Sequence, residues 1–262
     1  MKLSIMPLLQ RLKHLACLAL LGGAGVFSHA ADLPFTVAAD PWCPFNCTPN
    51  SSRPGYMVEL LTLILKPHGY SVRYKILPWN RAVASAESGE IDGVLAAGEE
   101  DATKLRLHTT PIGMSAQAYV VRRGDEFDWV DANSLGSRRL EIIKGYDYGP
   151  DVMGWIERHP KQTELSYGET PLQSGLKKLL ARRSDVVVNN ISVLRYTLKD
   201  LDLSEAFTVR PTGKQVPLFI GLSPKNPQAN RLAGLLDEGI ARLRKSGELK
   251  AVMAAYGLTD WQ

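Results

Sequence analysis

The stretch P-W-N-R-A-V-A-S-A-E-S-G-E-I-D-G-V-L-A-A-G, from Pro78 to Gly98, decides the fold class of this chain. Its first apolar residues recur at the spacing of an amphipathic helix: Trp79, Ala82, Val83 and Ala86. Gly89 is placed to end that helix, because glycine readily adopts the left-handed conformation of a C-cap. The run 91–97 is short and apolar, as in a parallel strand covered on both faces. We therefore expect an α/β unit whose ligands lie at the carboxyl ends of its strands.

Residues 1–30 have the organisation of an export signal. Lys2, Arg11 and Lys13 form a basic start, an apolar stretch follows, and Ser-His-Ala ends the segment. This pattern predicts cleavage after Ala30 and export to an oxidising compartment, with a retained amphipathic anchor as the alternative. The apolar stretch is shorter than the roughly 20 residues that a membrane span needs.

The predicted signal also carries most of the net positive charge. Three of the 31 Lys and Arg residues and none of the 27 Asp and Glu residues lie in it, so cleavage lowers the formal net charge from +4 to +1. A nearly neutral chain gives no support for nucleic-acid binding. The remaining length suffices for one large domain or two lobes with good cores.

Two cysteines, Cys43 and Cys47, remain after cleavage and lie close together in W-C-P-F-N-C. An even number of cysteines at short spacing in an exported chain favours a disulfide. The alternatives are two free thiols or half of a metal site. No second Cys or His pair has ligand spacing, so the sequence predicts no metal and implies no cofactor.

Strand and helix patterns alternate along the remaining chain. Predicted strands cover 35–39, 70–77, 91–97, 117–122, 140–143, the surroundings of Leu165, 186–188 and 218–222. Besides the helix that Gly89 ends, predicted helices cover 56–67, 149–158, 172–182, 192–198, 227–245 and 248–256. Repeated strand–helix units predict α/β architecture with mostly parallel sheets. Glycine-containing pairs at 124–125 and 213–214 flank the middle set, which favours two lobes joined by two crossing strands over a single doubly wound sheet.

The order of these segments resembles that of the bacterial periplasmic solute-binding proteins of the polar amino-acid type. The motifs that carry the resemblance are A-A-D-P-W at 38–42, G-Y-M-V-E-L-L at 55–61, P-W-N-R-A and S-G-E-I-D-G within 78–93, L-G-S-R-R-L-E-I-I-K-G-Y at 135–146 and S-G-E-L-K-A-V-M-A-A-Y-G at 246–257. The resemblance implies a type II periplasmic-binding-protein fold, with two mostly parallel sheets joined by a two-strand hinge. Lobe 1 would comprise residues 31–122 and 217–262, and lobe 2 residues 123–216.

The resemblance also implies ligand contacts in the first lobe. In such proteins an aromatic residue after the first strand covers the ligand, and Trp42 fills that position, with packing on the lobe surface as the alternative. After the strand that follows G-E-I-D, amino-acid binders place hydroxyl residues and an arginine that clamps the ligand carboxylate. The hydroxyl positions fall on Ala97 and Glu99. The arginine position falls on Lys104, with Arg106 nearby, and solvated loop charges are the alternative for both.

In the second lobe this chain also departs from the family pattern. Asn189 and Asn190 stand where the family often has an aspartate for the ligand ammonium, and we expect Asn190 to contact the ligand without supplying charge. Asp147 lies near the position where the second lobe of such proteins contacts the ligand. We expect Tyr146 and Tyr148 to stack on the ligand or hydrogen-bond to it, with packing between the lobes as the alternative. Without the usual charged anchors, a simple α-amino acid does not follow as the ligand. The acidic residues instead favour a basic amino acid or an amine: Glu99, Glu100, Asp101 and Asp147.

We therefore expect a non-enzymatic, monomeric periplasmic protein that closes over a small polar solute, amino acid-like, amine or related. It would present this solute to the membrane permease of an ABC importer, in amino acid transport. One alternative is a sensory protein that signals to a membrane receptor without transport. Another is a periplasmic enzyme of the cyclohexadienyl dehydratase type, with Glu99 or Glu169 as general acid. No Ser/His/Asp, zinc or phosphate-loop pattern supports the enzyme.

Overall fold

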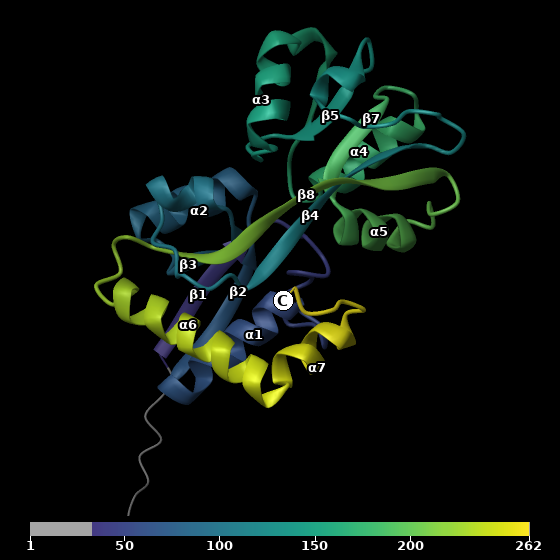
Figure 1. The fold of residues 1–262 in the computed structure, drawn as a ribbon. Helices are drawn as coiled ribbons and strands as arrows, with labels where there is room; N and C mark the ends of the chain where they lie inside the picture. Colours follow the sequence, from purple (N-terminus) through teal and green to yellow (C-terminus); the bar gives the residue numbers. More distant parts are fainter. Residues whose placement is uncertain (1–32, 262) are drawn as a thin grey trace, which may run out of the picture. The chain divides into compact units, whose positions relative to one another are not determined.

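The computed structural model describes residues 33–261, and the predicted export signal lies outside the described residues. Within this range no helix is long and apolar enough to cross a membrane. Strands and helices alternate on either side of two long central strands, as Figure 1 shows. The described chain therefore has the α/β architecture that the repeated strand–helix pattern predicts.

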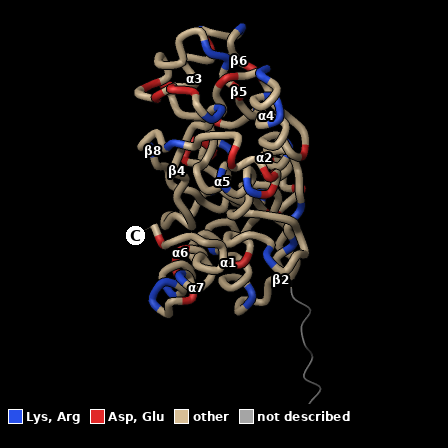
Figure 2. The backbone as a smooth tube through the Cα atoms, turned by 90° about the vertical axis from the view of Figure 1, so that its right-hand side faces the viewer, with Lys and Arg blue, Asp and Glu red and all other residues tan. Residues whose placement is uncertain are grey.

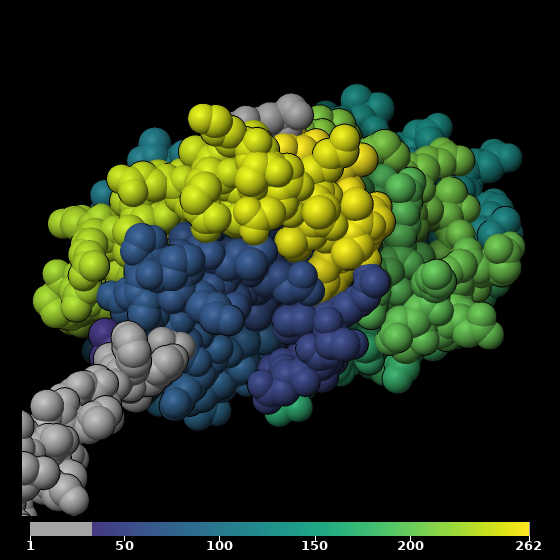
Figure 3. All heavy atoms as spheres, turned by 90° about the horizontal axis from the view of Figure 1, so that it is seen from below, coloured from purple at the N-terminus to yellow at the C-terminus, as the bar shows by residue number. Residues whose placement is uncertain are grey.

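The first lobe is built on the parallel strands β1 (Leu33–Ala39), β2 (Tyr70–Ile76) and β3 (Gly93–Ala97). β1 lies between β2 and β3 and pairs with both. The helices of this lobe are α1 (Tyr56–Leu65), α2 (Trp79–Ser88), α6 (Ala229–Ser246) and α7 (Glu248–Ala255). α6 and α7 pack against α1, and Figure 3 shows them in yellow beside the blue of α1. Their apolar faces enclose the core of the lobe.

The second lobe repeats this plan with β5 (Leu140–Ile143), β6 (Thr163–Ser166) and β7 (Val186–Asn190). β5 lies between β6 and β7 and pairs with both in parallel. Its helices are α3 (Gly149–Arg158), α4 (Pro171–Leu180) and α5 (Ile191–Asp200). Trp155 of α3 is fully buried in a separate apolar cluster of this lobe.

Two antiparallel strands, β4 (Gly113–Arg122) and β8 (Phe207–Leu222), join the lobes. β8 pairs with β4 along most of its length and with β3 at its end. The order of hydrogen-bonded strands is β2-β1-β3-β8-β4-β7-β5-β6, so a parallel group stands at each end and the antiparallel pair in the middle. This is the predicted arrangement of two mostly parallel sheets with a two-strand connection. The residue limits of the two lobes given above stay a prediction.

The stretch 78–98 folds into the predicted helix, turn and strand. Gly89 ends α2 with a φ of 87°, and β3 follows after a tight turn. The central strands are longer than predicted, since β4 begins at Gly113 and β8 at Phe207. Many side chains of β8 are exposed, so its first half has no strand-like hydrophobic pattern, and main-chain hydrogen bonds to β4 hold it.

Short 3-10 helices occupy several of the connections: η1 (Lys66–His68), η2 (Glu99–Thr103), η3 (Ala132–Leu135) and η4 (Pro160–Gln162). The predicted disulfide between Cys43 and Cys47 is present, with the two Cα atoms 4.5 Å apart. Lys and Arg residues are interspersed with Asp and Glu residues over both lobes, as Figure 2 shows. This mixture agrees with a net charge near zero for the described chain.

Candidate functional site

Two adjoining cavities lie between the lobes. The first has a volume of about 110 Å³ and the second about 560 Å³. The following residues line both cavities: Trp42, Glu100, Ser115, Tyr146, Asp147 and Val216. Because this shared wall contains residues of both lobes and of the connecting strands, the two cavities are compartments of one interlobe cleft.

The carboxyl ends of the parallel strands deliver most side chains of the first cavity. Asp40 comes directly after β1, and Trp79 begins α2 just after β2. Tyr146 follows β5 of the other lobe. This placement agrees with the general rule that ligands of open α/β sheets bind beyond the carboxyl ends of strands.

A bulge shapes the end of β3 where it borders the first cavity. The pairing of β3 with β8 shifts register between Val94 and Ala97, and Ala96 has a positive φ of 62°. Non-glycine residues seldom adopt this conformation, which is found more often at binding and active sites. As a result Ala96 and Gly98 line the cavity, while Ala97 between them is buried in the core.

A buried carboxyl group connects the lobes in the first cavity. Asp40 is 3% exposed, and the hydroxyl of Tyr146 donates a hydrogen bond to its Oδ2 atom. Burial raises the pKa of Asp40 to about 6, and the hydrogen bond from Tyr146 opposes part of that shift. Asp40 therefore titrates near neutral pH and contacts the opposite lobe directly.

The disulfide loop that follows Asp40 supplies an aromatic wall and an amide. The Asn46 side chain donates through Nδ2 to the main-chain oxygen of Asp40 at 2.7 Å and to the hydroxyl of Tyr74 at 3.1 Å. The indole Nε1 of Trp42 donates to Oδ1 of Asn189, in the other lobe, at 2.8 Å. The hydrogen bonds of Trp42 and Tyr146 thus both cross the cleft, and this structure is a closed one.

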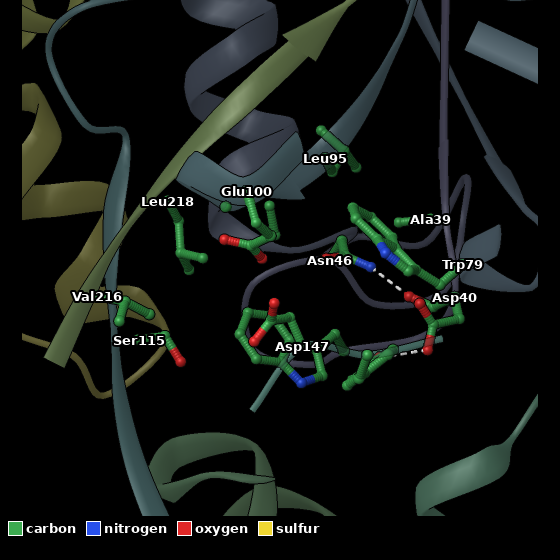
Figure 4. Close-up of a pocket in the computed structure, with 14 residues that line it drawn as sticks. Ala39, Asp40, Asn46, Trp79, Leu95, Glu100, Ser115, Asp147, Val216 and Leu218 are labelled. Atoms are coloured by element: carbon green, nitrogen blue, oxygen red, sulfur yellow. Dashed lines mark hydrogen bonds between the residues drawn. The ribbon is translucent and has the colours of Figure 1, made fainter. Parts of the chain in front are cut away.

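The polar groups of the first cavity are mainly acceptors. Glu100, from η2, and Asp147, from the second lobe, point their carboxyl groups into the same space, as Figure 4 shows. Burial raises the pKa of Glu100, and the nearby charges of Asp101 and Asp147 add to the rise. Among its described lining residues this cavity has no Lys, Arg or His. A cation between the carboxylates would relieve their mutual repulsion.

The second cavity has hydrogen-bond donors in its lining in addition to the carboxyl groups of Glu99, Glu100 and Asp147. Lys214 of β8 lines it, and its Nζ lies 3.6 Å from Oδ2 of Asp151. Asn189 and Asn190 of β7 also line it, as does Gly149 at the start of α3. In the described chain no group of three or more His, Cys, Asp or Glu side chains is arranged to hold a metal ion.

The structure brings together most, but not all, of the residues that the sequence predicts at the site. Trp42, Tyr146 and Asp147 line both cavities, and Glu99 and Asn190 line the second.

The remaining predicted contacts lie away from both cavities. Ala97 is buried because the bulge turns it into the core, and Lys104 is exposed at the end of η2. The guanidinium of Arg106 donates to Oδ1 of Asn230, on α6, and to the main-chain oxygen of Leu107. An ungapped count from the G-E-I-D motif missed this geometry because the bulge and η2 change the path of the chain.

Several residues of the cleft escaped the sequence prediction. Asp40 and Trp79 follow β1 and β2, so the rule on strand ends would have found them. Ser115 and Lys214 lie on the long antiparallel strands, where no local signal marks a binding residue. Asn46 reaches the cavity only because the disulfide loop folds back.

Comparison with known proteins gives the family. Residues 35–259 match the model of the bacterial extracellular solute-binding proteins, family 3. The chain belongs to this family. The resemblance drawn from the sequence motifs is thereby confirmed. No curated protein sequence matches the chain.

Solved structures share the fold of this chain. An ancestral arginine-binding protein bound to arginine has 17% identity and a TM-score of 0.72, with 86% of this chain and 99% of that chain covered. A histidine kinase sensor domain with similarity to periplasmic binding proteins has 22% identity and a TM-score of 0.70, with 88% and 99% covered. An ABC uptake transporter substrate-binding protein from Streptococcus pneumoniae with bound histidine has 16% identity and a TM-score of 0.69, with 85% and 92% covered. At these identities the likeness supports the fold, and the predicted type II fold is confirmed.

Proposed function

We propose that this family 3 protein is a periplasmic solute-binding protein that closes over a small cationic solute, an amine or a basic amino acid. It then presents the solute to the permease of an ABC importer. The observation that carries the proposal is the acceptor-rich first cavity, into which Asp40, Glu100 and Asp147 project from both lobes. Carboxylates that face one another across a closing cleft repel, and a bound cation converts that repulsion into attraction.

The aromatic residues of the first cavity support the same class of ligand. Trp42, Trp79 and Tyr146 line the space that the carboxyl groups share. Aromatic rings attract cations through their negative faces, by about 0.5–2 kcal/mol per contact. Acids and rings together suit a cation with an apolar chain better than a neutral or anionic solute.

The hinge mechanism follows from the interlobe hydrogen bonds. Trp42 with Asn189, and Tyr146 with Asp40, can form only when the lobes approach. A ligand that contacts both lobes binds the closed state more tightly and therefore shifts the population toward it. A membrane partner that recognises the closed state can then distinguish loaded from empty protein.

Binding tests this proposal directly. Protein freed of bound solute by unfolding and refolding is titrated calorimetrically with arginine, lysine and agmatine, and with glutamate and succinate as anionic probes. We expect binding by at least one cation and none by the anions. Glu100→Gln should weaken cation binding about tenfold, whereas Glu87→Gln, on the exposed side of α2, should leave it unchanged. Selective binding of the anions would overturn the proposal.

A sensory role is the second candidate, and the similarity to a histidine kinase sensor domain favours it over the remaining alternatives. Uptake of the radiolabelled solute separates the two roles, because deletion of the gene lowers uptake only if the protein takes part in transport. We take the protein as non-enzymatic, in keeping with its binding-protein relatives. Mass spectrometry of the solute after incubation tests this, and appearance of a product would contradict it.

A further inference from the structure

Two buried amide groups in the cleft lack a hydrogen-bond partner, and they lie in different compartments. Asn46 lines the first cavity, is fully buried, and leaves its acceptor Oδ1 unpaired. Asn189 lines the second cavity, is 5% exposed, and leaves its donor Nδ2 unpaired. Unpaired buried polar atoms are rare and costly, so each of these atoms indicates a partner that the protein itself does not supply.

The orientation of both amides follows from the groups around them. Nδ2 of Asn46 donates to the main-chain oxygen of Asp40, which only accepts, so Oδ1 must be the free atom. Oδ1 of Asn189 accepts from the indole of Trp42 and from the main-chain nitrogen of Asn190, which both only donate. Nδ2 of Asn189 is therefore the free atom. The first cavity lacks a donor and the second lacks an acceptor.

The acids border both cavities, but the basic side chain does not. Asp40, Glu100 and Asp147 line the first cavity, together with Asn46 and its free Oδ1, whereas Glu99, Glu100 and Asp147 line the second. The second cavity contains Lys214, the lone Lys or Arg among the described residues that line either compartment. Asp151 occupies one side of the ammonium at 3.6 Å, and an ammonium has three donors to share. The first cavity therefore combines acids and a free acceptor with no cation among its described lining residues, and the second contains the Lys of the cleft and a free donor.

We propose that the ligand is a bifunctional ion, bound with its N–H-bearing cationic end in the first cavity and a carboxylate end at Asn189 and Lys214 in the second. This inference rests on the proposed function, which it makes more specific. The family resemblance implies a carboxylate clamp in the first lobe and an ammonium site in the second. The orientation proposed here is the reverse of that arrangement. The acceptors of the first cavity favour a head with several N–H groups, such as a guanidinium, over a quaternary ammonium. A basic amino acid then binds through its side-chain cation and its carboxylate, and its α-ammonium is dispensable.

Four related probes test this orientation by calorimetric titration of the refolded protein. Arginine carries all three groups, agmatine lacks the carboxylate, 5-guanidinopentanoate lacks the α-ammonium, and norvaline lacks the guanidinium. We expect 5-guanidinopentanoate to bind within about threefold of arginine, agmatine to bind about tenfold more weakly or worse, and norvaline to give no heat.

A variant then links the carboxylate to Lys214. In Lys214→Met the difference between agmatine and 5-guanidinopentanoate should shrink to about twofold, while agmatine keeps its wild-type affinity. Lys177→Met, on the exposed surface of α4, should keep the full difference. Asn189→Leu is a second variant for the same end, and circular dichroism confirms that each variant is folded.

The outcomes separate this inference from the function on which it rests. Equal binding of agmatine and 5-guanidinopentanoate by the wild-type protein overturns the inference and leaves the cationic ligand class standing. Loss of affinity on removal of the α-ammonium also overturns it. If norvaline binds and agmatine does not, or if none of the cationic probes binds, the proposed function itself fails.

Discussion

Asp40 shows how one residue couples the chemistry of the cleft to the stability of the protein. The sequence analysis predicts no ligand contact for Asp40 itself, yet this residue follows β1 and meets Tyr146 across the cleft. Its pKa of about 6 reflects burial, which disfavours the charged form. Between about pH 4 and pH 6 this carboxyl group therefore holds a proton in the folded protein that the unfolded chain would release.

The raised pKa of Asp40 predicts a pH dependence of stability. Between about pH 4 and pH 6 the folded state binds more protons at this residue than the unfolded state, so the free energy of unfolding falls as pH rises. Above pH 6 the cost levels off at about 2–3 kcal/mol. Asp40→Asn keeps an acceptor for Tyr146 and removes the titration. We therefore expect this variant to be more stable than wild type at pH 8, and we expect the difference in stability to be much smaller at pH 4.5.

Urea unfolding of ligand-free protein at these two pH values measures the effect. Asp200→Asn, at the exposed end of α5, serves as the control and should follow the wild-type curve. A gap between wild type and Asp40→Asn that does not change with pH would contradict the assignment of the titration to Asp40.

Among the elements, α6 shows that identical residues in one helix can have opposite roles. Gly239 faces α1, and a Cβ atom there would lie 2.5 Å from Cγ2 of Ile64, closer than packed atoms tolerate. Gly234 lies more than one turn earlier in α6, and a Cβ atom on this residue would meet open space. The helical pattern of the sequence predicts α6, but only the packing of α6 on α1 tells the two glycines apart.

The same substitution at the two glycines should change stability in opposite directions. Gly234→Ala should raise the free energy of unfolding by about 0.5–1 kcal/mol, because alanine favours the helix. Gly239→Ala should lower it, because overpacking against Ile64 costs about 1–3 kcal/mol and exceeds the gain in helix propensity. Urea unfolding of both variants side by side measures the difference, and two changes of the same sign would be inconsistent with the packing of α6 on α1.

At the scale of the whole described chain, the proposed function depends on the approach of the two lobes. Besides the hydrogen bonds across the cleft, Asn80 of α2 lies directly over Gly145, which precedes Tyr146 in the second lobe. A Cβ atom on Gly145 would lie 2.1 Å from Oδ1 of Asn80. A larger and stiffer side chain at position 80 would press on the backbone of Gly145 when the lobes close.

Bulk at position 80 should therefore hold the lobes apart. Asn80→Tyr should lower ligand affinity about tenfold or more, because only the closed fraction binds fully. In small-angle X-ray scattering we expect the wild-type radius of gyration to decrease with ligand and that of Asn80→Tyr to decrease less. Ala84→Tyr places the same side chain one turn further along α2, on its exposed side, and should behave as wild type. Full contraction of Asn80→Tyr on ligand binding would show that this contact does not limit closure.

Sequence and tertiary structure each account for a different part of this protein. The order of strands and helices, Gly89 as a helix end and the disulfide follow from the sequence, because periodicity, turn residues and cysteine spacing are local properties. The resemblance of its motifs to family 3 gave the family. The first halves of β4 and β8 escaped prediction from the sequence, since each is held by antiparallel pairing with the second half of the other strand and not by a pattern of apolar side chains. Local sequence patterns predict the residues of the cleft even less well. A bulge turns Ala97 into the core, η2 redirects the chain before Arg106, and Asp40, Asn46 and Lys214 meet only where distant segments fold together. A binding site depends on atoms brought close in space, and only the tertiary structure decides which atoms those are.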